Sequence, residues 1–484
     1  MARVQRIGAT ELPVVVIGAG PVGLAAAAHL LERGLEPLVL EAGDDVAAAV
    51  RAWGHVRLFS PWEYDVDAAA ARLLGQAGWE IPDRDALPSG AELVNSYLAP
   101  LAATPQMASR IQTGTRVLAV SRAGMDKTRT VGREGRPYLV RTVHDGQVVD
   151  LRARAVIDAS GTWGHANPLG VAGLEAVGES EAAPWLVGPL PDVLGADRKR
   201  FAGKHTIVVG MGHSAANTLL ALAQLRDEEP GTEITWAIRG RSPARLYGGG
   251  DADGLPARGL LGSTLKAAVA SGAIALIREF TVTELTAPAD GTGPLTVTGS
   301  GRDAEPVSLL VDAVAAATGF RPDLDMLREV RLDLDPAVEA PAQLAPLIDP
   351  NFHSCGTVPP HGERLLAHPD ENFYIVGMKS YGRAPTFLLA TGYEQVRSIA
   401  AALAGDTDAA ERVELNLPET GVCSTDLGDR EAAETASGSG CGTPANVGFN
   451  TGSEHGYAAE EPTTGGCCGS APQPVSISAP SCGS

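Results

Sequence analysis

Short apolar runs that end at a glycine recur along the chain, and each predicts a buried strand followed by a tight turn. The run Val14–Ile17 is apolar and rich in β-branched residues, which suits a parallel strand covered on both faces. The letters GAGPVG follow at 18–23 and open an alanine-rich stretch with the length of a helix. A further apolar run ends at Glu41. Residues 11–43 are therefore predicted to form a strand, a glycine turn, a helix and a second strand.

Each glycine of GAGPVG has its own physical role in a turn of this kind. Gly18 permits the tight turn, Gly20 lets the backbone approach a pyrophosphate, and Gly23 lets the helix pack closely on the strand. The first N–H groups of the helix remain free to face phosphate oxygens. Glu41 ends the second strand, where a carboxylate can accept hydrogen bonds from a ribose hydroxyl. The four residues together predict a dinucleotide-binding site.

The same pattern returns in the middle of the chain. The strand-like run 206–209 leads into Gly210, Gly212 and Ala215, and an amphipathic helix follows. The end of the next strand differs from its counterpart in the first copy, because Arg239 stands where the first copy has an acid. A second dinucleotide-binding loop is therefore predicted.

Arginine at the end of that strand suits a 2′-phosphate, which it can hold through charge-assisted and bidentate hydrogen bonds. Arg239 therefore favours NADPH over NADH. The alternative is that Arg239 and Arg241 are surface charges on a loop. Two dinucleotide loops in one chain predict an α/β fold with two Rossmann-type domains, most simply one for FAD and one for NADPH, with hydride passing between them.

Two more apolar runs enter glycine-bearing turns, VIDASGTWG at 156–164 and VAAATGFRPD at 314–323, and we expect them to carry the chain out of the first domain and back into it. With these features the chain resembles the two-dinucleotide-binding flavoproteins, and among them the flavin-containing monooxygenases, over roughly residues 10–405. The resemblance implies that the second domain is inserted in the first. The expected divisions are an FAD-binding domain at 1–165 and 310–415, an NADPH-binding domain at 166–309, and a tail at 416–484.

The resemblance also implies roles for individual residues. FAD contacts would come from Gly18, Gly20, Gly23 and Glu41, and NADPH contacts from Gly210, Gly212, Ser214 and Arg239. An ATG-type turn falls at Ala317, Thr318 and Gly319. The segment that closes the FAD site is expected to contain a strand at 373–376, a turn at Gly377, and a helix from about Pro385 that is aimed at the flavin.

Composition narrows the class of partner. The chain has 484 residues, 44% of them apolar, and a formal net charge of −20 that repels polyanions. Nucleic acid and anionic membranes are therefore disfavoured, and we expect a small-molecule substrate; the oligomeric state is left open. No targeting segment is recognised. Five of the six cysteines lie after residue 420 and not within the expected fold, which argues against a disulfide scaffold and for a reducing, cytoplasmic location.

Cysteine placement also bears on the chemistry. A disulfide reductase needs a dithiol against the flavin, and no CxxC or CxxxxC motif occurs in the core. Met378 stands where such enzymes carry an acid. These departures favour a monooxygenase, which takes hydride from NADPH and uses oxygen to oxidise a small soft nucleophile. The alternative enzyme is an NADPH-dependent reductase that passes electrons to tail thiols or to a thiophilic metal ion.

Candidate active-site groups occur in two stretches. The stretch AWGHVRLFSPWEYD at 52–65 is expected to pass the flavin, and it offers Arg57 and His55 as candidates. The alternative is a packed aromatic loop with Arg57 in a salt bridge. Cys355 is the single core cysteine, near His353, His361 and His368, but their spacing matches no standard zinc site. A structural or substrate-lining role is favoured there over a metal.

The tail is expected to be disordered, because residues 421–484 hold twelve glycines and only five branched aliphatic residues. The adjacent pair Cys467 and Cys468 is similar in style to the cysteine pairs of mercuric reductases and of arsenic-handling proteins. Our hypothesis is that this pair captures a thiophilic metal or a trivalent arsenical and delivers it to the flavin, as in arsenic resistance. The alternatives are an incidental tail, a regulatory redox element, or a metalloid-binding chaperone or sensor on a flavoprotein scaffold.

Overall fold

In this computed structural model the described residues are 12–248, 255–301, 305–350, 358–385 and 387–415. They form two lobes, each built around a parallel five-stranded sheet. The sheet of the first lobe has the strand order β16-β7-β1-β2-β3. Its strands are β1 (Val14–Ile17), β2 (Pro37–Leu40), β3 (Ile111–Gln112), β7 (Ala155–Asp158) and β16 (Phe373–Ile375). The predicted strands at 14–17 and 373–376 and the strand before Glu41 are confirmed within one residue.

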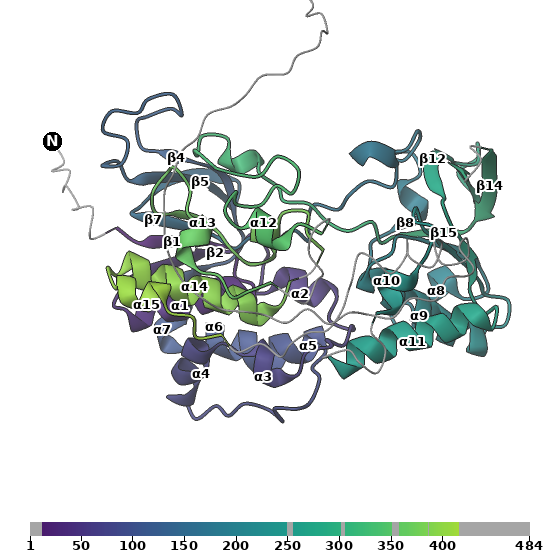
Figure 1. The fold of residues 1–484 in the computed structure, drawn as a ribbon, viewed down its shortest axis with the longest axis horizontal. Coiled ribbons are helices and arrows are strands. Elements are labelled where there is room, and N and C mark those ends of the chain that lie inside the picture. Colours follow the sequence, from purple (N-terminus) through teal and green to yellow (C-terminus); the bar gives the residue numbers. More distant parts are fainter. Residues whose placement is uncertain (1–11, 249–254, 302–304, 351–357, 386, 416–484) are drawn as a thin grey trace, which may run out of the picture. The chain divides into compact units, whose positions relative to one another are not determined.

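Helices cover one face of this sheet and a second sheet covers the other (Figure 1). The antiparallel cover consists of β4 (Thr115–Arg122), β5 (Tyr138–His144) and β6 (Gln147–Ala153). The longer helices are α1 (Pro21–Glu32), α4 (Ala68–Gly75) and α14 (Leu389–Leu403). Short helices are α2 (Ala48–Ala52), α3 (Trp62–Asp65), α5 (Gly90–Leu93), η2 (Val94–Leu98), α6 (Ala99–Ala102), α7 (Pro105–Ala108), η6 (Asp325–Leu327), α12 (Ala345–Ile348), α13 (Glu363–Leu366), η7 (Gly377–Tyr381) and α15 (Thr407–Glu411).

Strand β1 is apolar at every position because both of its faces are buried. Val14 and Val16 belong to the core beneath the helices, whereas Val15 and Ile17 belong to the core beneath the antiparallel sheet. Alternate side chains of a strand point to opposite faces, so a strand covered on both sides needs apolar residues throughout.

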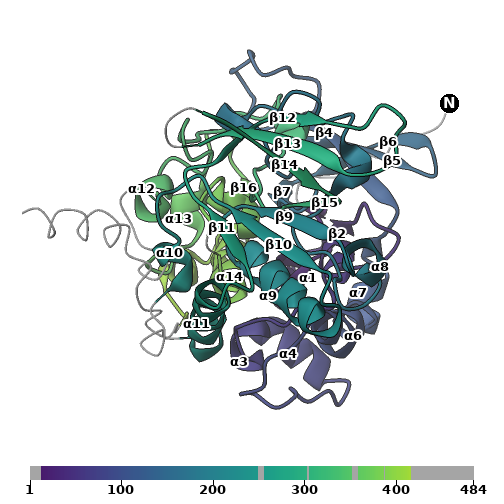
Figure 2. The same ribbon diagram turned by 90° about the vertical axis from the view of Figure 1, so that its right-hand side faces the viewer.

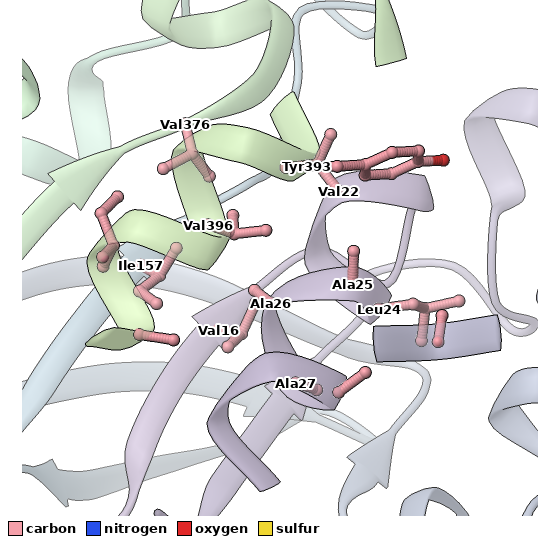
Figure 3. Packing of buried hydrophobic residues seen from close by; sticks show 14 of the residues in the cluster. Val16, Val22, Leu24, Ala25, Ala26, Ala27, Ile157, Val376, Tyr393 and Val396 are labelled. Carbon is pink, nitrogen blue, oxygen red and sulfur yellow. The ribbon is translucent and has the colours of Figure 1, made fainter. Parts of the chain in front are cut away.

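Helices α1 and α14 pack on one another through small and branched side chains. Figure 3 shows Val396 and Tyr393 of α14 directed towards Val22 and the alanines of α1. The run of alanines removes side-chain bulk, which lets the two helices approach closely. The helix expected from about Pro385 instead begins at Leu389, because Leu388 has an extended backbone (φ −109°, ψ 142°) and forms the N-cap.

The second lobe repeats the arrangement. Its sheet has the order β11-β10-β9-β15-β8, and a separate antiparallel sheet has the order β12-β13-β14 (Figure 2). The strands are β8 (Leu186–Val187), β9 (His205–Val209), β10 (Glu233–Ala237), β11 (Ala275–Ile277), β12 (Thr281–Thr286), β13 (Leu295–Ser300), β14 (Pro306–Val311) and β15 (Ala313–Ala316). The helices are η3 (Val171–Gly173), η4 (Ala183–Trp185), α8 (Arg198–Phe201), α9 (His213–Glu228), α10 (Ala244–Tyr247) and α11 (Pro256–Ala270).

The two chain crossovers between the lobes lie side by side. Ala166 and Phe320 form an antiparallel bridge, and the N–H of Asn167 donates to the carbonyl of Gly319 at 2.9 Å. The expected boundary at residue 310 is wrong, since β14 and β15 belong to the second lobe. Strand β15 pairs with β9 along its whole length, as far as Ala316. The chain returns to the first lobe only after that residue.

Candidate dinucleotide-binding sites

The first glycine loop has the backbone geometry that a dinucleotide turn needs. Gly18 has a φ of +99°, and a Cβ atom on it would lie 2.7 Å from the carbonyl oxygen of Ala159. A Cβ atom on Gly23 would collide with the carbonyl oxygen of Gly18, so α1 packs closely on β1. Gly20 differs, because among the described residues no atom other than those of its chain neighbours lies within 4 Å of the place where its Cβ would be. The backbone is therefore open to a ligand at Gly20 alone among these three glycines.

The second loop reproduces this geometry. Gly210 has a φ of +132°, and a Cβ atom on it would collide with the carbonyl oxygen of Ala317. Gly212 is open in the same sense as Gly20. Ala215 takes the place of Gly23 and is fully buried. Both loops thus leave one backbone position free for a pyrophosphate to approach.

The helices that follow both loops begin without a side-chain cap. Gly20 is the N-cap of α1 and Gly212 that of α9, and neither helix has an acidic residue in its first turn. The N–H groups of the first turn and the positive end of the helix dipole are therefore presented towards an anion. Ser214 lies in the first turn of α9 and is half-buried.

Glu41 holds the first loop from the end of β2. One carboxylate oxygen accepts from the N–H of Ala19 at 2.8 Å, and the other accepts from the N–H of Gly43 at 2.8 Å. A carboxylate oxygen can accept two hydrogen bonds, so Glu41 keeps capacity for a ribose hydroxyl while it fixes the loop. The acid therefore fits its predicted role.

Two arginines follow β10, and they differ in their surroundings. Arg241 forms an ion pair with Glu279 at 3.0 Å. Arg239 is exposed, and no ion pair within the described ranges involves it. Arg239 is thus available to a phosphate group, whereas Arg241 already has a partner.

The predicted ATG-type turn lies in the returning crossover. The hydroxyl of Thr318 donates to the carbonyl of Asn167 at 2.5 Å, and Gly319 has a φ of +86°. Gly377 also has a positive φ, +66°, and its N–H donates to the side chain of Gln395 at 2.8 Å. Gly377 therefore links the end of β16 to α14.

Sequence reasoning missed a buried charged cluster beside the first loop. The ammonium of Lys379 lies 2.7 Å from Oδ2 of Asp158 and 3.1 Å from Oγ of Ser160. The exposed fractions of the two charged side chains are 1% and 0%. An aspartate within the apolar letters VID, and a lysine just after the predicted turn at Gly377, were the available signals.

The stretch 52–65 divides into an exposed and a buried part. Arg57 donates to the carbonyl of Leu87 and lies 3.8 Å from Glu92, with its side chain 62% exposed, so it makes the salt bridge of the alternative reading. His55 is exposed on the same loop. The ring of Phe59 lies 5.2 Å from that of His213, the first residue of α9. Catalytic roles for Arg57 and His55 stay predictions.

Asp65, at the end of α3, is a buried acid that forms no ion pair with any described residue. Its Oδ1 accepts from the hydroxyl of Ser60 at 2.7 Å, and its Oδ2 has no hydrogen-bond partner in the described chain. Burial raises the pKa of Asp65 to about 7, although the Ser60 hydrogen bond lowers it. Tyr393 of α14 donates to the backbone carbonyl of Asp65 at 2.8 Å, which ties α14 to α3.

The two described histidines of the stretch around Cys355 have structural partners. His361 lies between the carbonyl of Pro359, 3.0 Å from Nδ1, and the amide nitrogen of Gln395, 2.9 Å from Nε2. Nδ1 of His368 accepts from the N–H of Asp333 at 3.3 Å. Burial lowers the pKa of both histidines, that of His368 to about 4. Within the described chain no group of three or more potential metal ligands occurs. Cys355, Cys467 and Cys468 lie outside the described residues.

Comparisons with known proteins agree with this architecture. Residues 15–351 match the family model described as pyridine nucleotide-disulphide oxidoreductase. The bacillithiol disulfide reductase Bdr (YpdA) from Bacillus cereus is 21% identical with a TM-score of 0.59, over 81% of this chain and 99% of that one. The cadaverine monooxygenase DfoA of desferrioxamine biosynthesis from Erwinia amylovora is 14% identical with a TM-score of 0.56, over 86% and 99%.

A flavin monooxygenase from Stenotrophomonas maltophilia is 22% identical with a TM-score of 0.50, over 81% of this chain and 98% of that one. At these identities the likeness concerns the fold. No curated protein sequence matches the chain significantly. Among the helices described, none combines the length and the apolar character that a membrane span requires.

Proposed function

This chain belongs to the pyridine nucleotide-disulphide oxidoreductase family, and on that premise we propose that it is an NADPH-dependent flavin monooxygenase. Membership makes the chain an oxidoreductase that works with FAD and a pyridine nucleotide. The proposed substrate is a small soft nucleophile, and oxygen is the second substrate. When bound, FAD supplies the ring that accepts hydride and reacts with oxygen.

One observation carries the proposal: two open glycine loops stand in lobes whose described residues include no cysteine. The two loops support binding of two dinucleotides, one of which can reduce the other. A disulfide reductase would need a dithiol against the flavin, and the described lobes offer none. Oxygen is then the electron acceptor that requires no further protein group.

The residues of the chain act by binding and orientation. In the first lobe, Glu41 would hold the ribose of FAD while the open backbone at Gly20 admits its pyrophosphate. In the second lobe, Gly212 would do the same for NADPH, and Arg239 would hold the 2′-phosphate. Arg57, His55 and Cys355 remain candidate substrate-contacting groups, and the aromatic stretch 52–65 would help to exclude water.

The open glycines provide a matched test. Gly20→Ala and Gly212→Ala each add a methyl group where no described residue other than the chain neighbours has an atom within 4 Å, so both variants should fold like the wild type. Gly20→Ala should weaken FAD binding at least tenfold, a loss of about 1.4 kcal/mol. Gly212→Ala should retain FAD and raise the KM for NADPH by a similar factor. Normal binding of both cofactors by both variants would contradict the proposed sites.

A second candidate function is an NADPH-dependent reductase whose electron acceptor is the tail. The likeness to bacillithiol disulfide reductase and the five tail cysteines favour it. In a related proposal, Cys467 and Cys468 capture a trivalent arsenical, which is then the soft nucleophile that is oxidised. Replacing both cysteines with alanine should then weaken binding of a trivalent arsenical in titrations.

Oxygen use separates the two functions. The protein is reduced by NADPH without air and is then mixed with ¹⁸O₂ and a panel of thioethers, amines and trivalent arsenicals. A monooxygenase incorporates one labelled oxygen atom into one substrate and consumes one O₂ per NADPH. NADPH oxidation that requires the tail cysteines, consumes no ¹⁸O₂ and labels no substrate would support the reductase and contradict our proposal.

A further inference from the structure

The buried pair of Lys379 and Asp158 joins the carboxyl ends of two strands. In parallel α/β folds, ligands bind at this end of the sheet. Asp158 is the last residue of β7, and Lys379 lies in η7, which follows β16. The two strands are parallel neighbours, and the N–H of Val376 donates to the carbonyl of Asp158 at 2.9 Å. The ion pair therefore fixes the positions of the two turns that leave these strands.

Ser160 completes the cluster. Its hydroxyl donates to Oδ1 of Asp158 at 2.6 Å and accepts from Lys379 at 3.1 Å, and its N–H also donates to Oδ1 at 3.1 Å. The Asp158 carboxylate thus accepts three hydrogen bonds, from the ammonium of Lys379 and from the hydroxyl and the N–H of Ser160, and both charged side chains are buried. A buried ion pair adds little net stability compared with apolar side chains of similar size, because both charges lose their hydration. Stability alone therefore does not account for this pair.

Both turns held by the pair touch the first glycine loop. A Cβ atom on Gly18 would lie 2.7 Å from the carbonyl oxygen of Ala159 and 3.1 Å from Cα of Ser160. On the other side, a Cβ atom on Gly377 would lie 3.4 Å from the side chain of Val22 in the first turn of α1. Val376, the residue before Gly377, lies in the same buried cluster as Val22 (Figure 3). The ion pair of Lys379 and Asp158 therefore supports the two turns that lie on either side of the first glycine loop.

The turn at Gly377 is also held from the helix side. Gln395 of α14 accepts from the N–H of Gly377 at 2.8 Å and donates to the hydroxyl of Ser380 at 2.9 Å. That hydroxyl in turn donates to the carbonyl of Gly377 at 2.7 Å. One side of the turn is thus fixed to α14, and Lys379 holds the turn to the end of β7 through Asp158.

We propose that Lys379, through Asp158 and Ser160, is a positioning residue that holds the first glycine loop in its FAD-binding geometry. The inference rests on the proposed binding of FAD in the first lobe. It concerns affinity for the cofactor and assigns Lys379 no contact with the reacting atoms. Removing the charges together should weaken FAD binding even where folding is preserved.

The first lobe offers a matched control. Arg133 and Asp370 form another buried pair, 2.6 Å apart, with exposed fractions of 4% and 2%. Asp370 precedes β16, so this pair lies at the opposite end of the strand from Lys379. The test compares Asp158→Asn/Lys379→Met with Asp370→Asn/Arg133→Met, in which the same types of change are made.

FAD binding to the apoprotein is followed by quenching of flavin fluorescence, and folding by urea unfolding. The Asp158→Asn/Lys379→Met variant should raise the FAD dissociation constant at least tenfold, whereas the control pair should change it less than twofold whatever its stability. Equal effects of both pairs on FAD affinity would overturn the inference. Ser160→Ala is the milder variant, with an expected threefold or greater loss of affinity, and an unchanged value would also count against the proposal.

Failure of the underlying function gives a different result. A wild-type protein that binds no FAD would contradict the proposed function itself. A wild type that binds FAD, with an Asp158→Asn/Lys379→Met variant of equal affinity, would overturn only the role of Lys379.

Discussion

At the scale of single residues, the choice of nicotinamide cofactor is expected to depend on Arg239. Charged hydrogen bonds contribute about 1.5–3 kcal/mol, so Arg239→Gln should lower kcat/KM for NADPH roughly 10- to 100-fold. The value for NADH, which lacks the 2′-phosphate, should change little. Steady-state kinetics with both cofactors measures the difference.

Arg241→Gln is the matched control, because Arg241 follows the same strand and already pairs with Glu279 at 3.0 Å. It should leave the preference for NADPH within about twofold, since surface ion pairs contribute little. If Arg241→Gln removed the preference and Arg239→Gln did not, the assignment of the 2′-phosphate to Arg239 would be wrong.

Residue-level sequence reasoning succeeded where backbone conformation determines the residue type. Gly18 and Gly210 were recognisable because their positive φ values and close neighbours exclude other side chains. The cluster of Lys379 and Asp158 could not be found in the same way, because its members are 221 residues apart and are joined by the sheet alone. Chemistry that depends on such distant pairs leaves no local spacing to recognise.

At the scale of elements, the two loops differ in how tightly the helix meets the strand. Gly23 of α1 has no room for a Cβ atom, whereas Ala215 of α9 carries one in the corresponding place. Gly23→Ala should therefore force α1 away from β1 and destabilise the protein by about 1–3 kcal/mol, as overpacking does. Urea unfolding at neutral pH measures the loss.

The reciprocal change tests the same idea. Ala215→Gly removes one buried methyl group and should cost about 1 kcal/mol, mainly through the lower helix propensity of glycine. Gly23→Ala should also lower FAD affinity, since a moved helix carries the loop with it. A Gly23→Ala variant as stable as the wild type would show that α1 can shift freely.

Element boundaries were predictable where the sequence changes sharply from apolar residues to glycine. The predicted boundaries were wrong where packing against other elements determines the start or end of an element. Strand β1 was predicted with its exact residues, since apolar letters give way to glycine at residue 18. The start of α14 was misplaced because proline permits a first helical turn without requiring one. The boundary at 310 failed because β15, although apolar like a first-lobe strand, pairs with β9.

At the scale of the whole molecule, the two-lobed architecture was predictable because one pattern occurs twice. A strand, a glycine turn and a helix each time imply a parallel sheet, and the intervening length implies an insertion. The antiparallel pairing of the two crossovers at Ala166 and Phe320 was not predictable, because neither segment has a strand-like pattern.

Stability as a function of pH is a property of the whole fold, and here two buried groups oppose each other. Burial raises the pKa of Asp65 to about 7, so between pH 4 and 7 the folded protein keeps a proton that the unfolded chain has released. The free energy of unfolding therefore falls as pH rises through this range. Burial lowers the pKa of His368 to about 4, so from pH 4 to 6.5 the unfolded chain binds the extra proton, and stability rises with pH.

Replacing one of these titrating side chains should reveal how the other side chains make stability depend on pH. Asp65→Asn keeps an acceptor for Ser60 but cannot titrate, so the stability of this variant should rise between pH 4 and 6.5, with His368 alone contributing up to about 1.4 kcal/mol per pH unit. His361, whose pKa burial also lowers, acts in the same direction. His368→Leu should shift the slope in the opposite direction, so that its stability rises less or falls more between pH 4 and 6.5 than that of the wild type. Urea unfolding midpoints at pH 5, 6 and 7 measure both slopes, and an Asp65→Asn curve parallel to the wild type would mean that Asp65 is charged throughout.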